Sequence, residues 1–418
     1  MPVPEPAPRV VAALGDAERM MRGRDFASAA TILRDVVAEE YASEAMCLLA
    51  SSCLELGEHD EALRYAVELV EREPRAPMAR EVLARSNLAL GQYDSALLNY
   101  EHLADICREQ RRLPPEQYAI PAHFALHNVE QIEHMLAVGN LDEQALGAVS
   151  VEELGGLREQ LVGMIDAADG AAPWVDVSGK SGRILADSPY VKVLEDKLSR
   201  YLNGDVDYHA VQWAILADRQ KAQVVDDFLT PDALQQVRRF CLESTVWRHA
   251  YKFGYAGAFP QDGFASVSLF AIAEEILAAL GEVLDGYYFA QWWGFVYDAN
   301  LPGVDVHADD ADFAVNLWIT PDSANLDPSS GGLVLWDKTA PGDWSFDDYN
   351  SGGERVREFL LEQRAEPIVV PHRANRAVLF GENIFHQTDG FTFAPGFANR
   401  RRSLTFLFRR RKRNRFLG

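Results

Sequence analysis

The chain of 418 residues contains few cysteines, and none of them forms a CxxC pair. The four are scattered, at Cys47, Cys53, Cys107 and Cys241. Isolated cysteines are most often simply buried, so we expect neither a disulfide framework nor a zinc site. A reducing compartment is the default for such a chain, and we therefore expect a cytoplasmic location.

Long apolar runs are also missing. No stretch approaches the roughly 20 apolar residues that a membrane-spanning helix requires, so we expect no membrane partner. Residues 1–9 lack the basic and apolar regions of a signal peptide. They predict a short, disordered leader.

Positive charge is scarce, with 40 lysines and arginines against 63 acidic residues and a net charge of −23. Because phosphate backbones are bound by basic surfaces, this balance argues against nucleic acid as the main partner. The exception is the C-terminal end, where nine lysines and arginines lie within residues 400–418. Residues 411–418 predict a basic tail, which is either a solvated charge run or an anchor for an acidic partner.

An internal repeat occupies residues 10–112. The segment GEHDEAL at 57–63 recurs as GQYDSAL at 91–97, a shift of 34 residues, and a weaker copy begins at Arg24. A period of 34 residues made of two helices is typical of tetratricopeptide repeats. We predict an all-α solenoid of three repeats. Its function is either a groove that binds a protein or peptide, or a helical spacer or dimerisation face.

Residues 113–205 predict a helical connector and linker. Apolar residues recur at spacings of three and four over 121–138 and 151–168. His123 and His127 share one face of the first helix at positions i and i+4. We interpret them as packing residues, because no HExxH pattern accompanies them.

Residues 206–410 change to a strand-rich pattern. Helices are expected at 231–242, where Thr230 serves as N-cap, and at 271–284. Short strands are expected at 291–297, 304–307, 313–319, 332–336, 367–370, 377–380 and 403–408. Many short strands after helices predict a sandwich or jelly roll with flanking helices. The acidic insertion at 339–364 predicts a long loop that serves as a lid.

The candidate metal ligands follow two of these strands. His307 and Asp309 lie two residues apart, which places both side chains on one face of an extended chain. His386 follows the strand at 377–380. Two imidazoles and one carboxylate fill one face of an octahedral ferrous ion and leave the opposite face open. His372, the competing candidate for the distal ligand, precedes that strand and is interpreted as a turn residue.

The order and spacing of these motifs resemble the prolyl-hydroxylase-like branch of the Fe(II)/2-oxoglutarate-dependent dioxygenases. The resemblance covers residues 206–410, and it is carried by residues 224–233, 307–309, 331–333, 377–380, 386 and 401–403. It implies a double-stranded β-helix, which is a jelly roll. It also implies that His307, Asp309 and His386 are the catalytic ligands of Fe(II).

The resemblance further implies a site for the co-substrate 2-oxoglutarate. Arg401 would pair with its distal carboxylate, since a guanidinium binds a carboxylate bidentately. Tyr297, ten residues before His307, occupies a position that hydrogen-bonds the co-substrate in relatives. Trp318 stands where relatives carry a second tyrosine, and Ser403 completes an Arg-x-Ser pattern. Asn316 lies on the polar face of its strand and is expected to point into the same cavity.

The implied reaction uses O2 and 2-oxoglutarate to hydroxylate an unactivated C–H bond, with release of succinate and CO2. Related halogenases have a small residue at the position of Asp309, so its presence favours hydroxylation. Three interpretations remain open. The substrate is a protein or peptide side chain presented by the repeats, or it is a small molecule such as an amino acid or natural product. Alternatively, the chain is a repeat-based interaction protein whose oxygenase-like domain is inactive.

Overall fold

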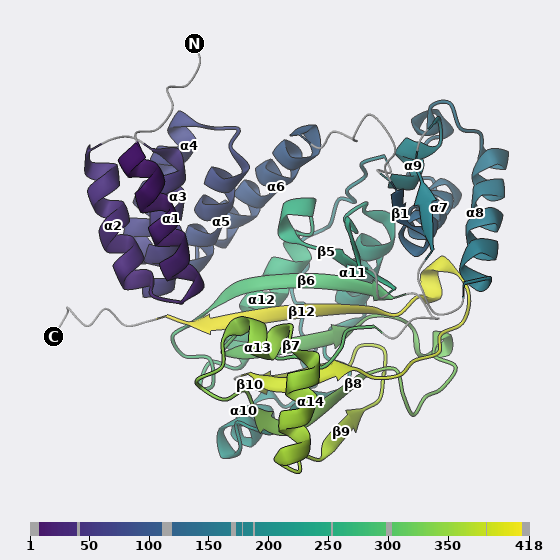
Figure 1. Cartoon of the computed structure of the whole chain (residues 1–418). Coiled ribbons are helices and arrows are strands. Elements are labelled where there is room, and N and C mark those ends of the chain that lie inside the picture. The colour runs from purple at the N-terminus through teal and green to yellow at the C-terminus, as the bar shows by residue number, and fades with distance from the viewer. Residues whose placement is uncertain are drawn as a thin grey trace. The chain divides into compact units, whose positions relative to one another are not determined.

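The computed structural model describes most of the chain, drawn in Figure 1. The described residues are 8–39, 42–110, 119–168, 173–177, 179–186, 189–251, 254–297, 303–381 and 383–411. Most of the predicted leader and of the predicted basic tail lies outside these residues. The chain divides into two compact units. We call them the repeat unit (residues 1–110, 284–290 and 408–418) and the sheet unit (residues 111–283 and 291–407).

The described residues of the repeat unit form six helices, coloured purple to blue in Figure 1. They are α1 (Pro8–Arg22), α2 (Phe26–Glu39), α3 (Ser43–Leu56), α4 (His59–Arg72), α5 (Pro77–Ala89) and α6 (Tyr93–Gln110). Each helix packs against the next along the chain. Gly57 ends α3 in the left-handed conformation at φ 82°, which a glycine adopts without steric penalty. The predicted helical repeat is confirmed.

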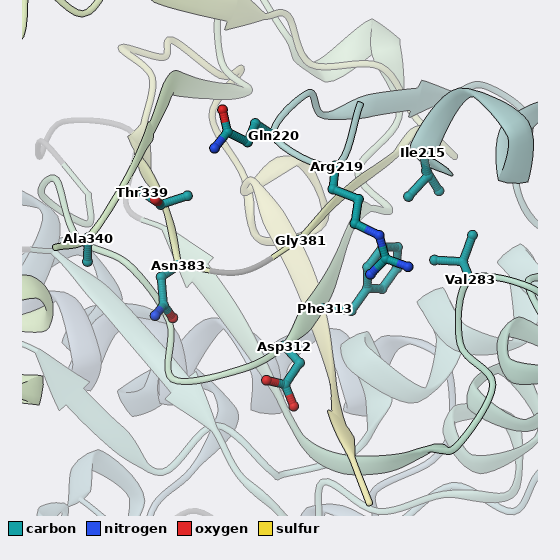
Figure 2. A pocket seen from close by; sticks show the side chains of 10 residues that line it. All are labelled: Ile215, Arg219, Gln220, Val283, Asp312, Phe313, Thr339, Ala340, Gly381 and Asn383. Carbon is teal, nitrogen blue, oxygen red and sulfur yellow. The ribbon is translucent and has the colours of Figure 1, made fainter. Parts of the chain in front are cut away.

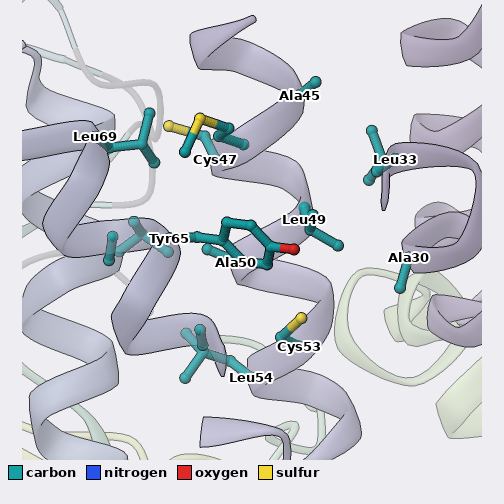
Figure 3. Packing of buried hydrophobic residues seen from close by; sticks show 14 of the residues in the cluster. Ala30, Leu33, Ala45, Cys47, Leu49, Ala50, Cys53, Leu54, Tyr65 and Leu69 are labelled. Carbon is teal, nitrogen blue, oxygen red and sulfur yellow. The ribbon is translucent and has the colours of Figure 1, made fainter. Parts of the chain in front are cut away.

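Small residues form much of the core of the repeat unit. Ala30, Ala45 and Ala50 are fully buried, and their small side chains let paired helices approach closely. Figure 3 shows them beside Leu49, Leu69 and two cysteines. Cys47 and Cys53 are free thiols, and burial raises the pKa of each to about 12. They are packing residues, as the sequence predicted.

The sheet unit is built around two antiparallel sheets. The major sheet has the strand order β3-β10-β7-β12-β6-β5-β4, and the minor sheet has the order β11-β8-β9. The major strands are β3 (Gln223–Val225), β4 (His249–Tyr251), β5 (Tyr255–Ala258), β6 (Tyr287–Tyr297), β7 (Phe313–Trp318), β10 (Ala377–Gly381) and β12 (Arg402–Arg410). The minor strands are β8 (Leu333–Thr339), β9 (Pro367–Val370) and β11 (Ile384–Thr388).

The two sheets enclose a common core. Alternate residues of β7, Ala314 and Trp318, face the same cluster as Leu333 and Leu335 of β8. Because side chains alternate between the faces of a strand, this pattern places every second residue of β7 between the sheets. The predicted fold class is thereby confirmed: an all-α repeat solenoid followed by a jelly roll with flanking helices.

Helices and short elements surround the sheets. The α-helices are α7 (Ala122–Ala137), α8 (Val151–Asp166), α9 (Gly182–Ala186), α10 (Tyr208–Ala217), α11 (Pro231–Glu243), α12 (Val267–Ala279), α13 (Phe346–Asn350) and α14 (Gly353–Glu362). The remaining short elements are β1 (Ala119–Pro121), β2 (Trp174–Asp176), η1 (Glu143–Leu146), η2 (Pro260–Asp262), η3 (Asp322–Ala324) and η4 (Phe397–Asn399). None of the described helices is long and apolar enough to span a bilayer.

Helix α7, in the predicted connector, is bound closely to the rest of the sheet unit. The amide of Gln131 donates to the carbonyl of Ser244 at 3.0 Å, and Glu130 pairs with Arg400 at 2.7 Å. His127 is buried against the rings of Trp247 and Phe397. This helix therefore belongs to the body of the sheet unit, and its histidine lies in a packed core.

Three sequence expectations about element boundaries were wrong. Helix α12 begins at Val267 because the hydroxyl of Ser266 caps it, accepting from the backbone of Leu269 at 3.3 Å. The expected strand at 304–307 is reduced to a single bridge at His307. The insertion at 339–364 is not an open loop, because it folds into α13 and α14 over their own apolar core.

Candidate metal centre

An antiparallel bridge places the two histidines of the candidate triad side by side. The backbone N–H of His307 donates to the carbonyl of His386 at 3.0 Å, and the reverse bond measures 2.8 Å. The two ring centroids are 4.3 Å apart. Asp309 reaches the same point, and one ligand atom from each of the three residues lies within 4.8 Å of the others. The structure thus brings together the three residues that the sequence predicted as ligands.

Backbone carbonyls orient both imidazole rings. Nδ1 of His307 lies 2.7 Å from the carbonyl oxygen of Asp305, and Nδ1 of His386 lies 3.0 Å from that of Ile384. Each Nδ1–H donates to its carbonyl, which leaves Nε2 with a free lone pair. Both Nε2 atoms lie 3.6 Å from a carboxylate oxygen of Asp309. The free donor atoms converge, as a metal site requires.

The charge states of the triad suit a divalent cation. Burial would raise the pKa of Asp309, but its contacts with His307 and His386 outweigh burial and lower it. Burial and the neighbouring His307 lower the pKa of His386 to about 4, so this ring is neutral near pH 7. Burial opposes protonation of His307, whereas Asp309 raises its pKa. A metal cation placed between one carboxylate and two ring nitrogens would replace the proton that Asp309 favours on His307.

The helical insertion holds the loop that carries two of the ligands. The backbone N–H of Ala308 donates to the carbonyl of Tyr349 at 2.9 Å, and the side-chain amide of Asn350 donates to the carbonyl of Ala308 at 3.0 Å. Ala308 itself is fully buried in the core of the insertion. No local sequence signal identified these supporting contacts, because they join segments about 40 residues apart.

Arg401 lies directly before β12, and its side chain is buried. Its Nε and Nη2 atoms donate to the carbonyls of Gly331 and Gly332 at 2.6 and 2.9 Å. The guanidinium carbon is 4.5 Å from the ring centroid of Tyr297. Burial lowers the pKa of Arg401, and Tyr297 opposes this shift. Among the described residues, Nη1 of Arg401 has no hydrogen-bond partner.

The other predicted co-substrate residues are on β7 and β12, which are neighbours in the major sheet. The amide of Asn316 donates to the hydroxyl of Thr405 at 3.1 Å, and Ser403 is the buried residue between Arg401 and Thr405 on the same strand face. Within the described residues, Asn316 Oδ1 and Trp318 Nε1 are buried without partners. The sequence did not indicate Thr405.

The two unpaired nitrogens, Nη1 of Arg401 and Nε1 of Trp318, fit a carboxylate ligand. A buried polar atom without a hydrogen bond is costly, so a group of them indicates a site built for a polar molecule. Donors on Arg401 and Trp318 match carboxylate oxygens. The donor set of the triad, with two nitrogens and one oxygen, fits ferrous iron. The described residues therefore fit both groups that the sequence resemblance implied.

A cavity of about 960 Å³ opens at the triad. His307, Asp309 and Asp310 line one part of it. Aromatic rings line much of the remainder, and we call them the aromatic wall: Tyr251, Tyr255, Phe259, Trp293, Phe295 and Phe346. The rings of Tyr251 and Tyr255 are stacked, with centroids 4.4 Å apart. No pattern in the sequence indicated this wall.

A second, smaller pocket of about 190 Å³ lies elsewhere in the sheet unit. Figure 2 shows Arg219 beside Phe313, with Thr339 and Asn383 across the pocket. None of the triad residues lines it. We assign it no catalytic role.

His372, the competing candidate ligand, lies outside the triad. It occupies the loop between β9 and β10, as predicted for a turn residue. It is nevertheless buried, with its ring centroid 5.7 Å from that of Trp318.

Comparison with known proteins identifies the repeat and finds distant structural likenesses. The tetratricopeptide repeat family model matches residues 16–69 and 47–110. No curated protein sequence matches the chain. One similar solved structure is the non-haem α-ketoglutarate-dependent epimerase SnoN from nogalamycin biosynthesis, with 15% identity, a TM-score of 0.38, and coverage of 48% of this chain and 84% of that one.

Two further solved structures are similar at the same level. HygX from Streptomyces hygroscopicus, with nickel and 2-oxoglutarate bound, has 12% identity, a TM-score of 0.34, and coverage of 48% of this chain and 86% of that one. A Pseudomonas putida prolyl-4-hydroxylase has 18% identity, a TM-score of 0.31, and coverage of 53% and 100%. By the family match, the chain carries a stack of tetratricopeptide repeats over residues 16–110.

Proposed function

We propose that the protein is an Fe(II)- and 2-oxoglutarate-dependent dioxygenase that hydroxylates an unactivated C–H bond. The observation that carries this proposal is the convergence of His307, Asp309 and His386 within 4.8 Å, with both Nε2 atoms free. Three ligands on one side of an ion leave its other positions open for substrate and O2. Inactive relatives need not preserve such an arrangement, so an interaction protein without activity is disfavoured.

Each group has a distinct role in the proposed reaction. His307, Asp309 and His386 hold the iron, which when bound with 2-oxoglutarate and O2 supplies the oxidising chemistry that yields succinate and CO2. Arg401 binds the distal carboxylate, and the ring of Tyr297 covers its guanidinium. Their burial excludes water and strengthens the charge interaction.

We propose that the substrate is a protein or peptide side chain. The cavity of about 960 Å³ lies near the upper end of the range for ligand pockets, roughly 300–1,000 Å³. It has room for several residues of a peptide around the oxidised side chain. Tetratricopeptide stacks are usually binding surfaces, and in this proposal the repeat unit selects the partner. The free, buried cysteines support a cytoplasmic location.

A small-molecule substrate is the second candidate, and the stacked pair Tyr251 and Tyr255 favours it. Flat aromatic faces bind ring systems by offset stacking. Mass spectrometry separates the two candidates. A peptide captured by the repeats that gains one oxygen atom in the presence of 2-oxoglutarate supports the first, and a metabolite that gains it supports the second.

The activity is tested with purified full-length protein, Fe(II), ascorbate and 2-oxoglutarate. We expect slow release of succinate even without substrate. His307→Ala and Asp309→Ala should abolish both metal binding and succinate release, whereas His209→Ala, on α10, should change neither. A wild-type protein that binds iron but releases no succinate would favour the interaction-protein hypothesis.

A further inference from the structure

Three buried side chains of the sheet unit carry polar atoms that have no hydrogen-bond partner among the described residues. Among the described residues, these atoms are Nη1 of Arg401, Nε1 of Trp318 and both ring nitrogens of His372. The three side chains are 1%, 0% and 5% exposed. Native proteins rarely leave several buried polar groups unpaired in one place, so their coincidence points to a missing ligand.

The three groups come from separate parts of the chain but lie together. Trp318 ends β7, His372 lies between β9 and β10, and Arg401 precedes β12. The rings of Trp318 and His372 are 5.7 Å apart and inclined by 30°. The guanidinium carbon of Arg401 is 6.0 Å from the ring centroid of Trp318. Trp318 is therefore the common neighbour of His372 and Arg401.

A pair of glycines brings these groups together and leaves one guanidinium nitrogen free. The carbonyls of Gly331 and Gly332 accept from Nε and Nη2 of Arg401, so Nη1 remains as its available donor. A Cβ at Gly332 would lie 2.8 Å from the ring of Trp318 and 2.9 Å from the backbone nitrogen of His372. Only glycine permits this approach.

The charge of the cluster calls for an anion. Arg401 forms no ion pair in the described part of the chain, and Asp389 acts on it only at longer range. Burial, Arg401 and Arg376 lower the pKa of His372 to about 3, so its imidazole is neutral at physiological pH. A neutral imidazole offers one N–H donor. One cation and two neutral N–H donors, without a counter-charge in contact, suit a single carboxylate.

We propose that Trp318 and His372 join Arg401 in binding the distal carboxylate of 2-oxoglutarate. In the family that the sequence resembles, a tyrosine stands at the position of Trp318. The N–H groups of Trp318 and His372 take the place of its hydroxyl. This inference rests on the proposed function. It adds His372 to the co-substrate site and gives Trp318 a donor role.

The proposed donors should make the protein selective among 2-oxo acids. A site built to hydrogen-bond a group rejects an analogue that lacks the group, because its own buried donors then stay unpaired. The analogue 2-oxopentanoate has the chain length of 2-oxoglutarate without the distal carboxylate. The ratio of its dissociation constant to that of 2-oxoglutarate therefore measures what the donors contribute.

The test uses full-length protein loaded with Fe(II) without oxygen, titrated with each 2-oxo acid and followed by the visible charge-transfer absorbance. We expect Trp318→Phe and His372→Phe each to weaken 2-oxoglutarate binding about 10- to 100-fold, as loss of a hydrogen bond to a charged group does. Binding of 2-oxopentanoate should change little. His372→Gln, which keeps an N–H donor, should restore most of the selectivity.

A matched control exists on α10, where His209 and Trp213 form another histidine–tryptophan pair, 5.9 Å apart. His209→Phe and Trp213→Phe should leave both affinities unchanged. If the Trp318 and His372 variants weaken both acids equally, or neither, the proposal is overturned and their role is packing alone. A wild-type protein that binds iron but gives no absorbance change with 2-oxoglutarate would instead overturn the proposed function itself.

Discussion

Histidines in this chain differ in how their ring nitrogens are held. His307 and His386 each direct one nitrogen to a backbone carbonyl and the other toward Asp309. His127 and His372 are buried like His386, but their ring nitrogens have no partners within the described residues. The first arrangement is that of a metal ligand, whose tautomer is set by a second contact. Burial alone would not have separated the two kinds.

Gly332 is the residue whose small size matters most to the co-substrate site. A Cβ there would lie 1.9 Å from the carbonyl oxygen of Val370, which is backbone and cannot move aside cheaply. We expect Gly332→Ala to destabilise the sheet unit by more than about 3 kcal/mol, beyond the usual cost of overpacking. Thermal unfolding followed by tryptophan fluorescence measures this loss.

Gly342→Ala is the matched control, because a Cβ at Gly342 meets no atom within 4 Å. Its unfolding temperature should stay at the wild-type value. An unchanged unfolding temperature in Gly332→Ala would contradict the close packing of Gly332 against Val370 and Trp318.

At the scale of elements, the insertion that contains α13 and α14 acts on the metal site through one short loop. Asn350, at the end of α13, holds the carbonyl of Ala308 between the two ligands His307 and Asp309. Contacts of this second layer orient ligands without touching the ion. The insertion is therefore part of the scaffold of the site.

We expect Asn350→Ala to weaken Fe(II) or Mn(II) binding about 10-fold, because loss of a supporting hydrogen bond typically costs 10- to 100-fold in metal affinity. Metal titration by calorimetry measures the change. Asn399→Ala is the control, since Asn399 also donates to a backbone carbonyl, that of Pro395, away from the triad. Equal metal affinity in wild type and Asn350→Ala would show that the insertion does not support the site.

The loop that carries His372 is fastened by an ion pair next to strand β3. Asp226 accepts from Nε and Nη2 of Arg376 at 2.6 and 3.0 Å, and from Arg373 at 3.0 Å. The hydrogen bond from Arg376 lowers the pKa of Asp226 below its ordinary value of 3.8. Because Asp226 is about one third exposed, solvent screening limits its contribution to roughly 1 kcal/mol.

The depressed pKa makes this contribution dependent on pH. A carboxyl group whose pKa is lower in the folded protein than in the unfolded chain stabilises the protein fully at pH values above its unfolded-state pKa. This stabilisation is lost as the pH falls through the folded-state pKa. Asp226→Asn should therefore lower the free energy of unfolding by roughly 1 kcal/mol at pH 7. The difference from wild type in urea unfolding should shrink below pH 3.8. A difference that stays constant into that range would contradict the ion-pair origin.

At the scale of the whole molecule, the chain divides into two compact units. The eight tryptophans all lie at or beyond residue 174 in the sheet unit, so their fluorescence reports on that unit alone. Both units contain α-helices, so helical circular dichroism reports on both of them. A change in the helical signal that tryptophan fluorescence does not follow therefore belongs to the repeat unit.

Leu49 is fully buried in the repeat core, and Leu49→Ala should destabilise that unit by about 2–5 kcal/mol. We expect part of the helical signal to melt at lower temperature while the tryptophan transition and anaerobic 2-oxoglutarate binding stay unchanged. Leu98→Ala, at a position 52% exposed on α6, should leave both transitions in place. Transitions that shift together in Leu49→Ala would show that the two units unfold as one.

Local patterns in the sequence were enough for several conclusions. The 34-residue period predicted the repeat unit, because each repeat is stabilised by its neighbours in sequence. The spacing of His307 and Asp309 predicted two ligands on one face, since that geometry depends only on an extended backbone. The role of Arg401 as a partner of the distal carboxylate was predicted from the family resemblance. Short strands with turns between them predicted the jelly roll.

Only the tertiary structure decided which distant groups meet. The bridge between His307 and His386, the support of Ala308 by Asn350, and the approach of His372 to Trp318 each join segments tens of residues apart. His372 looked like a turn residue because its neighbours in sequence form a turn, and its burial depends on strands elsewhere in the fold. Periodicity records the face of an element that is buried, whereas the partner of each side chain is set when the sheets close around a shared core.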